Sequence, residues 1–308
     1  MKQDFTTADL KEMLERALGA SLKPLKRLSC VNSINFKAVR ERDGFAFLVK
    51  CLPPHRLPDF IRLVRHAQET RGTRAVQRVF ENVVPEDFGA VKVICFAWCD
   101  GCFRFPDTLS SDELQAFVSD YQEFSSALQR VTLVMPGYTP KDWRDGALAA
   151  CGNGFWGRRL RRLLDETPEE TCCCRPEKLR VIHGDLHPGN FAFRDGRVAA
   201  FFDIGDFTWG YPALDFVRYF GFAIEHLSPF RVFRRRRLYR RFAEVVVRLP
   251  YPEDEWMVAI NETWMERIDK KLDGRPARAG AVLPLLLAVV PYRRLRKIVR
   301  RAKGGGHG

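Results

Sequence analysis

Side chains suited to moving a phosphoryl group are concentrated between residues 183 and 203. The segment opens with the run HGDLHPGN, from His183 to Asn190, and closes with the run FFD, which ends at Asp203. Phosphoryl transfer needs a divalent cation held by oxygen ligands, and it needs a carboxylate that orients or deprotonates the attacking hydroxyl. The carboxylates of Asp185 and Asp203 and the amide of Asn190 can supply these groups.

The spacing of these residues predicts that a tight loop and a hairpin bring them together. Asp185 and Asn190 share one loop that contains a Pro-Gly pair. The Asp-Gly dipeptide at 195–196 is a strong signal for a hairpin turn, and such a hairpin would return Asp203 to the loop. The alternative is that these side chains only stabilise turns, because Asp and Asn are common turn residues.

The same run of residues, followed by the run DIG at Asp203, resembles the catalytic and metal-binding loops of the aminoglycoside phosphotransferase and choline kinase superfamily, whose members are relatives of protein kinases. The resemblance implies ATP as the phosphoryl donor, Asp185 as the catalytic base, and Asn190 and Asp203 as Mg²⁺ ligands. It also implies that His183 orders the loop and that Asp215 bonds to backbone rather than to substrate.

A lysine that a kinase-like fold requires on its third strand is present as Lys50, at the end of the run FAFLVK. In that fold the lysine contacts the α and β phosphates of ATP and pairs with a glutamate. Glu69 is the first candidate for this glutamate and Glu81 is the second, while an ordinary solvated glutamate is the alternative. On its own, Lys50 would be interpreted as a surface lysine at a strand end.

The turn that would cover the phosphates departs from the glycine-rich loop of protein kinases. Residues 29–35 read SCVNSIN and contain no glycine. We expect Ser33 and Asn35 to cover the phosphates with hydroxyl, amide and backbone donors. This departure argues against a protein kinase and for a small-molecule kinase.

The run ICFAWCDG, at residues 94–101, resembles the hinge between the lobes of the same fold. Backbone groups there would bond the adenine, and Phe96 and Trp98 would sandwich it. Trp98 could equally be a core residue.

Hydrophobic periodicity and turn residues predict a small antiparallel sheet followed by a mainly helical region. With the resemblance, this order implies the α+β class and the bilobal protein-kinase-like fold. The expected division is an N-lobe of residues 1–99 and a C-lobe of residues 100–308. The expected strands are 25–28, 35–40, 45–50, 83–88 and 91–98, with a catalytic hairpin of 191–194 and 197–202, and the expected helices are 5–18, 60–80 and 111–130.

Composition points to a globular protein with an excess of positive charge. The 308 residues carry 51 Lys and Arg against 38 Asp and Glu. The nine cysteines include an adjacent trio at 172–174, which argues against a secreted disulfide framework. Cys95, Cys99 and Cys102 invite a zinc interpretation, but no matching second pair follows, so free buried thiols are favoured. No signal peptide is visible, and we expect a cytoplasmic protein.

Much of the basic excess lies in residues 275–303, which hold nine Lys or Arg and no Asp or Glu. The apolar run 279–291 is too short to span a bilayer, which takes roughly 20 residues, and Pro284 interrupts it. Residues 292–302 resemble an interfacial helix with one apolar face. This charge favours peripheral contact with anionic membrane at the inner face.

Together these features predict an ATP- and Mg²⁺-dependent kinase that phosphorylates a hydroxyl of a small molecule or glycan. The basic tail favours an anionic acceptor, such as a lipopolysaccharide core sugar, over a cationic aminoglycoside. The alternative is a catalytically silent nucleotide-binding scaffold with a membrane-surface tail. Nucleic-acid binding ranks last, because no recognised binding motif accompanies the charge.

Overall fold

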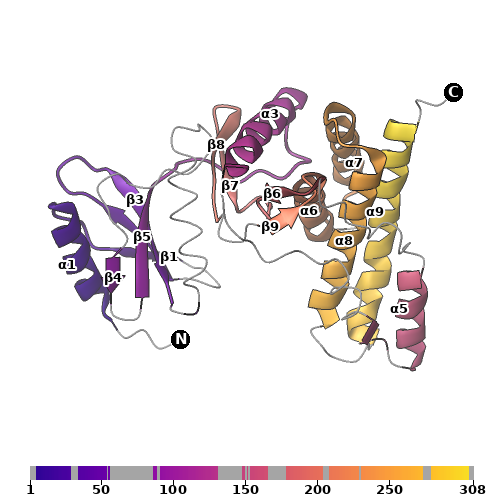
Figure 1. Ribbon diagram of the computed structural model, residues 1–308, viewed down its shortest axis with the longest axis horizontal. Helices are drawn as coiled ribbons and strands as arrows, with labels where there is room; N and C mark the ends of the chain where they lie inside the picture. The colour runs from indigo at the N-terminus through magenta and orange to yellow at the C-terminus, as the bar shows by residue number, and fades with distance from the viewer. Residues whose placement is uncertain are drawn as a thin grey trace. The chain divides into compact units, whose positions relative to one another are not determined.

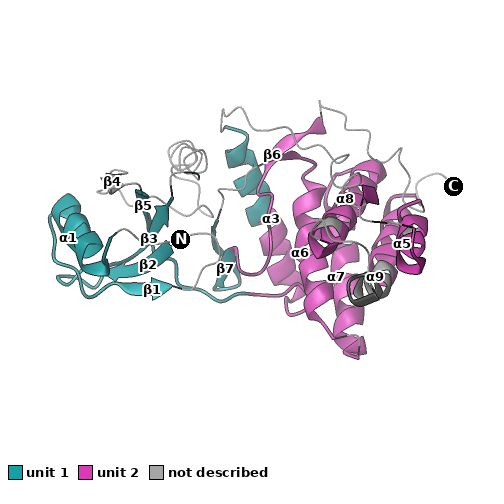
Figure 2. Cartoon of the chain, turned by 90° about the horizontal axis from the view of Figure 1, so that it is seen from below, with its two compact units in different colours: residues 1–103, 120–133, 191–206 teal, residues 104–119, 134–190, 207–308 magenta. Residues whose placement is uncertain are grey.

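The structure is a computed structural model, and the chain divides into two compact units (Figure 2). Unit 1 comprises residues 1–103, 120–133 and 191–206, and unit 2 comprises residues 104–119, 134–190 and 207–308. The expected lobes of residues 1–99 and 100–308 stay a prediction. The structure describes residues 5–28, 34–53, 55, 86–88, 91–130, 148–149, 151, 153–165, 178–203, 208–228, 230–272 and 279–304.

Unit 1 contains an antiparallel sheet with the strand order β1-β2-β3-β5-β4 (Figure 1). Its strands are β1 (Lys26–Leu28), β2 (Ile34–Val39), β3 (Ala46–Leu52), β4 (Glu86–Phe88) and β5 (Val91–Ala97). The first three form an antiparallel meander, and Gly44 has a φ of +70° in the tight turn between β2 and β3. The predicted strands are confirmed with ends moved by one or two residues, except that the start of the fourth lies outside the described residues.

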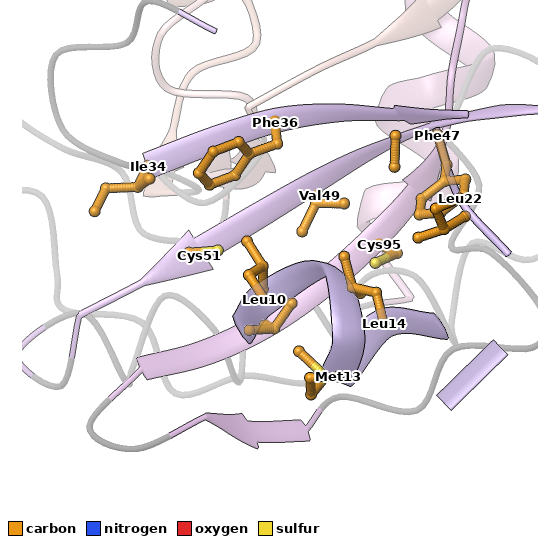
Figure 3. Packing of buried hydrophobic residues seen from close by; sticks show 12 residues of the cluster. Leu10, Met13, Leu14, Leu22, Ile34, Phe36, Phe47, Val49, Cys51 and Cys95 are labelled. Carbon is orange, nitrogen blue, oxygen red and sulfur yellow. The ribbon is translucent and has the colours of Figure 1, made fainter. Parts of the chain in front are cut away.

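Helix α1 (Thr7–Leu18) packs against one face of this sheet (Figure 3). Leu10 and Leu14 are fully buried, in one cluster with Val49 and Cys95 of the sheet. Burial of an aliphatic side chain contributes about 1.5 to 3 kcal/mol. This apolar layer therefore fixes which face of β3 and β5 turns toward the helix.

Both ends of α1 carry capping groups. The Thr6 hydroxyl accepts the N–H of Asp9 at 3.1 Å, and the Asp9 carboxylate accepts the N–H of Thr6 at 2.9 Å. At the other end Gly19 has a φ of +57°, a conformation that favours glycine. The predicted helix over 5–18 is confirmed, with Thr6 as its cap.

Helix α3 (Ser111–Leu128) begins with the same reciprocal cap. The Ser110 hydroxyl accepts the N–H of Glu113 at 3.1 Å, and the Glu113 carboxylate accepts the N–H of Ser110 at 2.8 Å. The predicted helix over 111–130 is thus confirmed, and it ends two residues earlier than expected.

The predicted hairpin of unit 1 is formed by β7 (Phe191–Arg194) and β8 (Arg197–Phe201). At its turn Asp195 has a φ of +54° and Gly196 a φ of +73°. Positive φ at both central residues is the pattern of a tight two-residue hairpin turn. Phe201 is fully buried and stacks on Phe124 of α3 at 4.4 Å between ring centroids, which anchors the end of β8.

Unit 2 is mainly helical, and its short strands β6 (Arg180–Ile182) and β9 (Thr208–Gly210) pair antiparallel. Its helices are α5 (Phe155–Asp165), α6 (Ala213–His226), α7 (Val232–Arg248), α8 (Glu253–Leu272) and α9 (Ala279–Lys303). Helix α8 packs against both α6 and α9, and α7 packs against α9 (Figure 1).

Helix α9 corrects two sequence-based interpretations. It runs without a break through Pro284, because a proline removes a single backbone hydrogen bond and the rest of the helix can persist. Its expected interfacial face is not available to a membrane, since Tyr292, Leu295 and Val299 are at most 1% exposed, and Tyr292 packs against Trp264 of α8 at 5.2 Å. Among the described residues, no helix is long and apolar enough to cross a bilayer. The helix expected over 60–80 lies outside them.

Candidate active site

Lys50 and Asp203 form an ion pair within unit 1. Lys50, in β3, is only 7% exposed, while the Asp203 side chain, just after β8, is 52% exposed. The alternative interpretation of Lys50 as a surface lysine is therefore wrong. A buried ammonium group needs an anionic partner, and the hairpin supplies one from a distant part of the sequence.

The backbone of Asp203 adopts an uncommon conformation, with a φ of +50°. Asp tolerates this left-handed region better than most residues, but the conformation still disfavours a side chain by about 1 to 3 kcal/mol. Such a conformation persists where the surroundings hold it. The ion pair with Lys50 and the anchored hairpin are those surroundings.

A buried carboxylate, Asp120 of α3, holds the hairpin in place within unit 1. It is fully buried, accepts the backbone N–H of Val198 at 2.9 Å, and forms an ion pair with Arg197. Sequence reasoning missed it. The signal was its position on the apolar face of α3, three residues after Phe117 and four before Phe124.

The turn that follows β5 contacts the same hairpin. Cys102 and Phe193 exchange two backbone hydrogen bonds, each of 2.9 Å. A Cβ atom at Gly101 would lie 2.7 Å from both the Cβ of Ala192 and the carbonyl oxygen of Phe193. Only glycine at position 101 allows this close approach of the two backbones.

The candidate nucleotide-binding residues Asn35, Lys50 and Phe96 lie on the face of the sheet away from α1. Asn35 of β2 is directly opposite Lys50 in the register. Val49 and Cys95 precede Lys50 and Phe96 in sequence and turn toward α1 (Figure 3). Because side chains alternate along a strand, the three candidates share the opposite face.

Trp98 follows β5 and is half-buried. Its ring nitrogen donates to Asp100 at 2.9 Å, and the ammonium of Lys37 lies 4.1 Å from the ring centroid. Lys37 and Asn35 are two residues apart in β2 and share one face. Ser33 and the two candidate partners of Lys50, Glu69 and Glu81, lie outside the described residues.

In unit 2, Asp215 holds the backbone of the loop that carries Asp185. It is fully buried in the first turn of α6, and its two oxygens accept the N–H groups of His183 at 2.8 Å and Gly184 at 2.9 Å. The expected backbone role of Asp215 is thereby confirmed. Buried His183 accepts the N–H of Asp185 through Nδ1 at 3.3 Å, which orders the loop.

Asp185 and Asn190 contact each other in one tight loop, as predicted. The Asn190 amide nitrogen donates to the carbonyl oxygen of Asp185 at 2.8 Å and approaches its Oδ2 at 3.4 Å. The loop is closed by a hydrogen bond of 2.9 Å from the N–H of Asn190 to the carbonyl of His187. Because the amide nitrogen is engaged, the amide oxygen is the atom of Asn190 that can bind a cation.

His187 belongs to the scaffold of this loop. Its Nδ1 accepts the N–H of Gly189 at 3.0 Å, and its ring stacks on Phe222 of α6 with centroids 5.0 Å apart. Its Nε2 lies 3.7 Å from the carboxylate of Asp185. The ring therefore supports the loop and borders the carboxylate of Asp185.

Arg218 of α6 ties the loop to α8. Its guanidinium donates to the carbonyl oxygen of Gly184 and to Glu266 at 2.8 Å. Lys270 reaches the other oxygen of Glu266 at 2.6 Å. Burial alone would raise the pKa of Glu266, but the two cations outweigh it and hold that pKa below its ordinary value. No sequence signal marked this set, because the pairing joins two helices far apart in the chain.

A polar pocket in unit 2 opens beside Asp185. It is bordered by three cations, two carboxylates and a stacked aromatic pair. The lining residues are Asp185, Leu186, His187, Arg218, Phe222, Thr263, Glu266, Arg267 and Lys270. The site thus combines a candidate base with a space for its substrate.

The expected metal ligands offer suitable atoms. Mg²⁺ prefers oxygen donors, which the Asn190 amide and the Asp203 carboxylate both have. Within the described ranges, no group of three or more His, Cys, Asp or Glu is placed to hold a metal. Of the three cysteines expected to be buried thiols, Cys95 is buried, whereas Cys99 is half-buried and Cys102 is exposed.

A family model matches part of the chain. Residues 107–250 match the profile of the phosphotransferase enzyme family. This segment contains Asp185, Asn190, Asp203 and Asp215. No curated protein sequence matches the chain.

Solved structures share the fold across nearly the whole chain. Spectinomycin phosphotransferase APH(9)-Ia, solved with ADP and spectinomycin, is 15% identical with a TM-score of 0.60, over 97% of this chain and 98% of that one. An aminoglycoside phosphotransferase from Alicyclobacillus acidocaldarius is 14% identical, with a TM-score of 0.59 and coverage of 91% and 92%. Macrolide 2'-phosphotransferase MphH from Brachybacterium faecium is 15% identical, with a TM-score of 0.53 and coverage of 98% and 99%.

The family match supports a small-molecule phosphotransferase that acts on hydroxyl groups. The comparisons confirm the predicted superfamily of aminoglycoside phosphotransferase-like kinases. The α+β kinase-like fold is confirmed as well.

Proposed function

We propose that this protein transfers the γ-phosphoryl group of ATP to a hydroxyl of a small molecule or glycan, with Mg²⁺ as cofactor. The observation that carries the proposal is the hydrogen-bonded loop that presents Asp185 in the wall of a polar pocket. In the reaction the acceptor oxygen bonds to the γ-phosphorus, the bond to the β–γ bridging oxygen breaks, and Asp185 takes the acceptor proton.

The sheet face away from α1 supplies the proposed nucleotide contacts. Lys50 would neutralise the α and β phosphates, and Ser33 and Asn35 would donate to phosphate oxygens. Phe96 and Trp98 would flank the adenine. Asn190 and Asp203 would hold Mg²⁺, which neutralises charge on the transferred group. The pairing of Glu69 with Lys50 remains a proposal, beside the ion pair of Lys50 with Asp203.

The charges of the pocket support an acceptor that is not cationic. The negative charge of Glu266 is paired with two cations, Arg218 and Lys270. Arg267 forms an ion pair with Glu225. Among the described lining residues, Asp185 is thus the carboxylate left without a guanidinium or ammonium partner. The lining residues carry three cations against two carboxylates, and this excess favours a phosphate or carboxylate over a polyamine such as an aminoglycoside.

A sugar with an anionic group, such as a lipopolysaccharide core sugar, fits this description best. The stacked rings of His187 and Phe222 provide a flat apolar wall for a sugar ring. Asp185 lies beside that wall, at 3.7 Å from His187. A hydroxyl of a sugar placed on the wall would therefore approach the base.

Nucleotide binding is tested first, because it needs no acceptor. ATP with Mg²⁺ at about 100 times its Kd should raise the free energy of unfolding by about 2.7 kcal/mol. Lys50→Ala should lose most of this rise, and Lys26→Ala, an exposed lysine of β1, should keep it. No stabilisation of the wild-type chain by ATP, with or without Mg²⁺, would refute the proposal.

The charge of the acceptor is tested by titrating glucose 6-phosphate, glucose and glucosamine, which share a ring and differ in charge. Binding should decrease in that order, and Lys270→Gln should reduce the preference for the phosphate by about two- to fivefold. The matched control is Lys271→Gln, because Lys271 is exposed and does not line the pocket. Tighter binding of glucosamine than of glucose 6-phosphate would contradict the assignment.

A further inference from the structure

Two phenylalanines at the start of α7 are almost fully exposed. Phe230 is 91% exposed and Phe233 is 84% exposed, and Val232 between them is 52% exposed. The two phenylalanines are the most exposed large apolar side chains of the described part of the chain. Isolated exposed apolar residues are ordinary, but three within four positions mark an interaction surface.

The chain around these residues is strongly basic. Residues 226–243 contain seven arginines and no Asp or Glu. Four of the seven are held by the protein itself: Arg234 by Asp107, Arg235 by the carbonyls of Ile224 and Leu227, Arg237 by the carbonyl of Leu109, and Arg241 by Ser111 and Glu244. The run is therefore not a purely solvated basic face.

The other three arginines are exposed beside the phenylalanines. Arg236 and Arg240 follow Phe233 by three and seven positions and share its face of the helix. Arg231 lies between the two phenylalanines in the sequence. The Nε of Arg240 is 4.0 Å from the carboxylate of Glu244. We call Phe230, Arg231, Val232, Phe233, Arg236 and Arg240 the α7 corner.

The α7 corner is held in place by buried residues and hydrogen bonds of unit 2. Leu238 and Phe242, on the opposite side of α7, are fully buried. Arg235 donates to the carbonyl of Leu227 at 2.9 Å, which closes the end of α6. Because both sides of the connection are tied down, the exposed rings are held outward by the fold.

We propose that the α7 corner docks on an anionic membrane surface. Phe side chains bury their rings at the boundary between headgroups and acyl chains, while arginines bind lipid phosphates. A second copy of the chain fits less well, because a twofold contact through this corner would place arginine against arginine. The positive charge selects anionic lipid over neutral lipid.

Docking there would bring the pocket to the surface where a lipid-linked acceptor lies. Phe222 lines the pocket and stacks on His226 at 3.9 Å, and Phe230 follows His226 by four residues. This consequence rests on the proposed function, whereas the docking itself does not. The two can therefore fail separately.

The test is co-sedimentation of the full chain with vesicles of phosphatidylglycerol and phosphatidylcholine, and with vesicles of phosphatidylcholine alone. The wild type should bind the anionic vesicles, and raised salt should weaken binding. The double variant Phe230→Ser, Phe233→Ser should bind about tenfold less. Arg231→Glu with Arg236→Glu should lose a similar amount.

Phe103→Ser is the matched control, since Phe103 is 65% exposed and lies in unit 1; it should bind like the wild type. Equal vesicle binding by the wild type and the corner variants would overturn the proposal. So would a wild-type dimer that the Phe230→Ser, Phe233→Ser variant converts to a monomer without any change in vesicle binding. Deletion of α9 is not a suitable test, because it would remove buried core residues.

Discussion

The ammonium of Lys50 and the carboxylate of Asp203 form an ion pair across 153 residues of sequence. The sheet buries the lysine, and the hairpin brings the carboxylate to it. This pair of opposite charges suits a nucleotide that carries a divalent cation. The lysine attracts the phosphates, and the carboxylate attracts the cation.

Removing either charge should therefore suppress turnover. Lys50→Ala and Asp203→Asn should each slow the formation of ADP from ATP by about 10²- to 10³-fold. Lys26→Ala should leave this rate unchanged. The measurement is a steady-state assay of ADP formation with Mg²⁺. Wild-type rates in both variants would exclude this pair from the site.

Asp215 should matter for stability as well as for activity. Asp215→Ala leaves the N–H groups of His183 and Gly184 without their partners, and we expect a loss of about 2 to 4 kcal/mol in the free energy of unfolding. Asp185→Asn, by contrast, should lower activity with little change in stability, because the Asp185 side chain is 51% exposed. Urea unfolding monitored by circular dichroism compares the two. Equal stability of both variants would contradict the backbone role of Asp215.

Gly101 should not tolerate a methyl group. Gly101→Ala places a Cβ 2.7 Å from Ala192 and Phe193, and the resulting shift should destabilise the hairpin by about 1 to 3 kcal/mol. Gly154→Ala is the control, because a Cβ there meets no atom within 4 Å. Thermal unfolding of the two variants is the measurement, and a Gly101→Ala chain as stable as the Gly154→Ala chain would refute the close approach.

The cysteines of unit 1 should differ in their reactivity toward alkylating reagents. Burial raises the pKa of Cys51 to about 12, and it raises the pKa of Cys95 as well. At about pH 8 the thiolate fraction of Cys51 is then on the order of 1 in 10⁴, and it increases only as the pH rises toward that pKa. Iodoacetamide followed by mass spectrometry should label exposed Cys102 and leave Cys51 intact. Equal labelling of the two would show that the sheet core is open.

The local part of the site was predictable because its signals are local. The loop of Asp185 and Asn190, the Asp195-Gly196 turn and the cap at Thr6 each depend on residues a few positions apart. Turns and helix caps can be predicted from residues that lie so close in the sequence. The strand that carries Lys50 was predictable from its apolar run.

The supporting contacts were not predictable, because they join distant segments. Asp120 meets Arg197 across 77 residues, and Arg218 meets Glu266 across 48. Nothing near either carboxylate in the sequence specifies its partner. The interfacial interpretation of residues 292–302 failed for a related reason, because an amphipathic face looks the same whether lipid or protein covers it.

The most direct test of the account is transfer of radioactive phosphate from γ-labelled ATP to a fractionated small-molecule extract. With Mg²⁺, the wild type should label a compound that carries an anionic group, and the control Asp195→Asn, at an exposed turn position, should label it equally. Asp185→Asn should reduce labelling by about 10²- to 10⁴-fold while ATP binding persists. Undiminished labelling by Asp185→Asn would contradict the account, because the phosphoryl acceptor would then be activated by some other group.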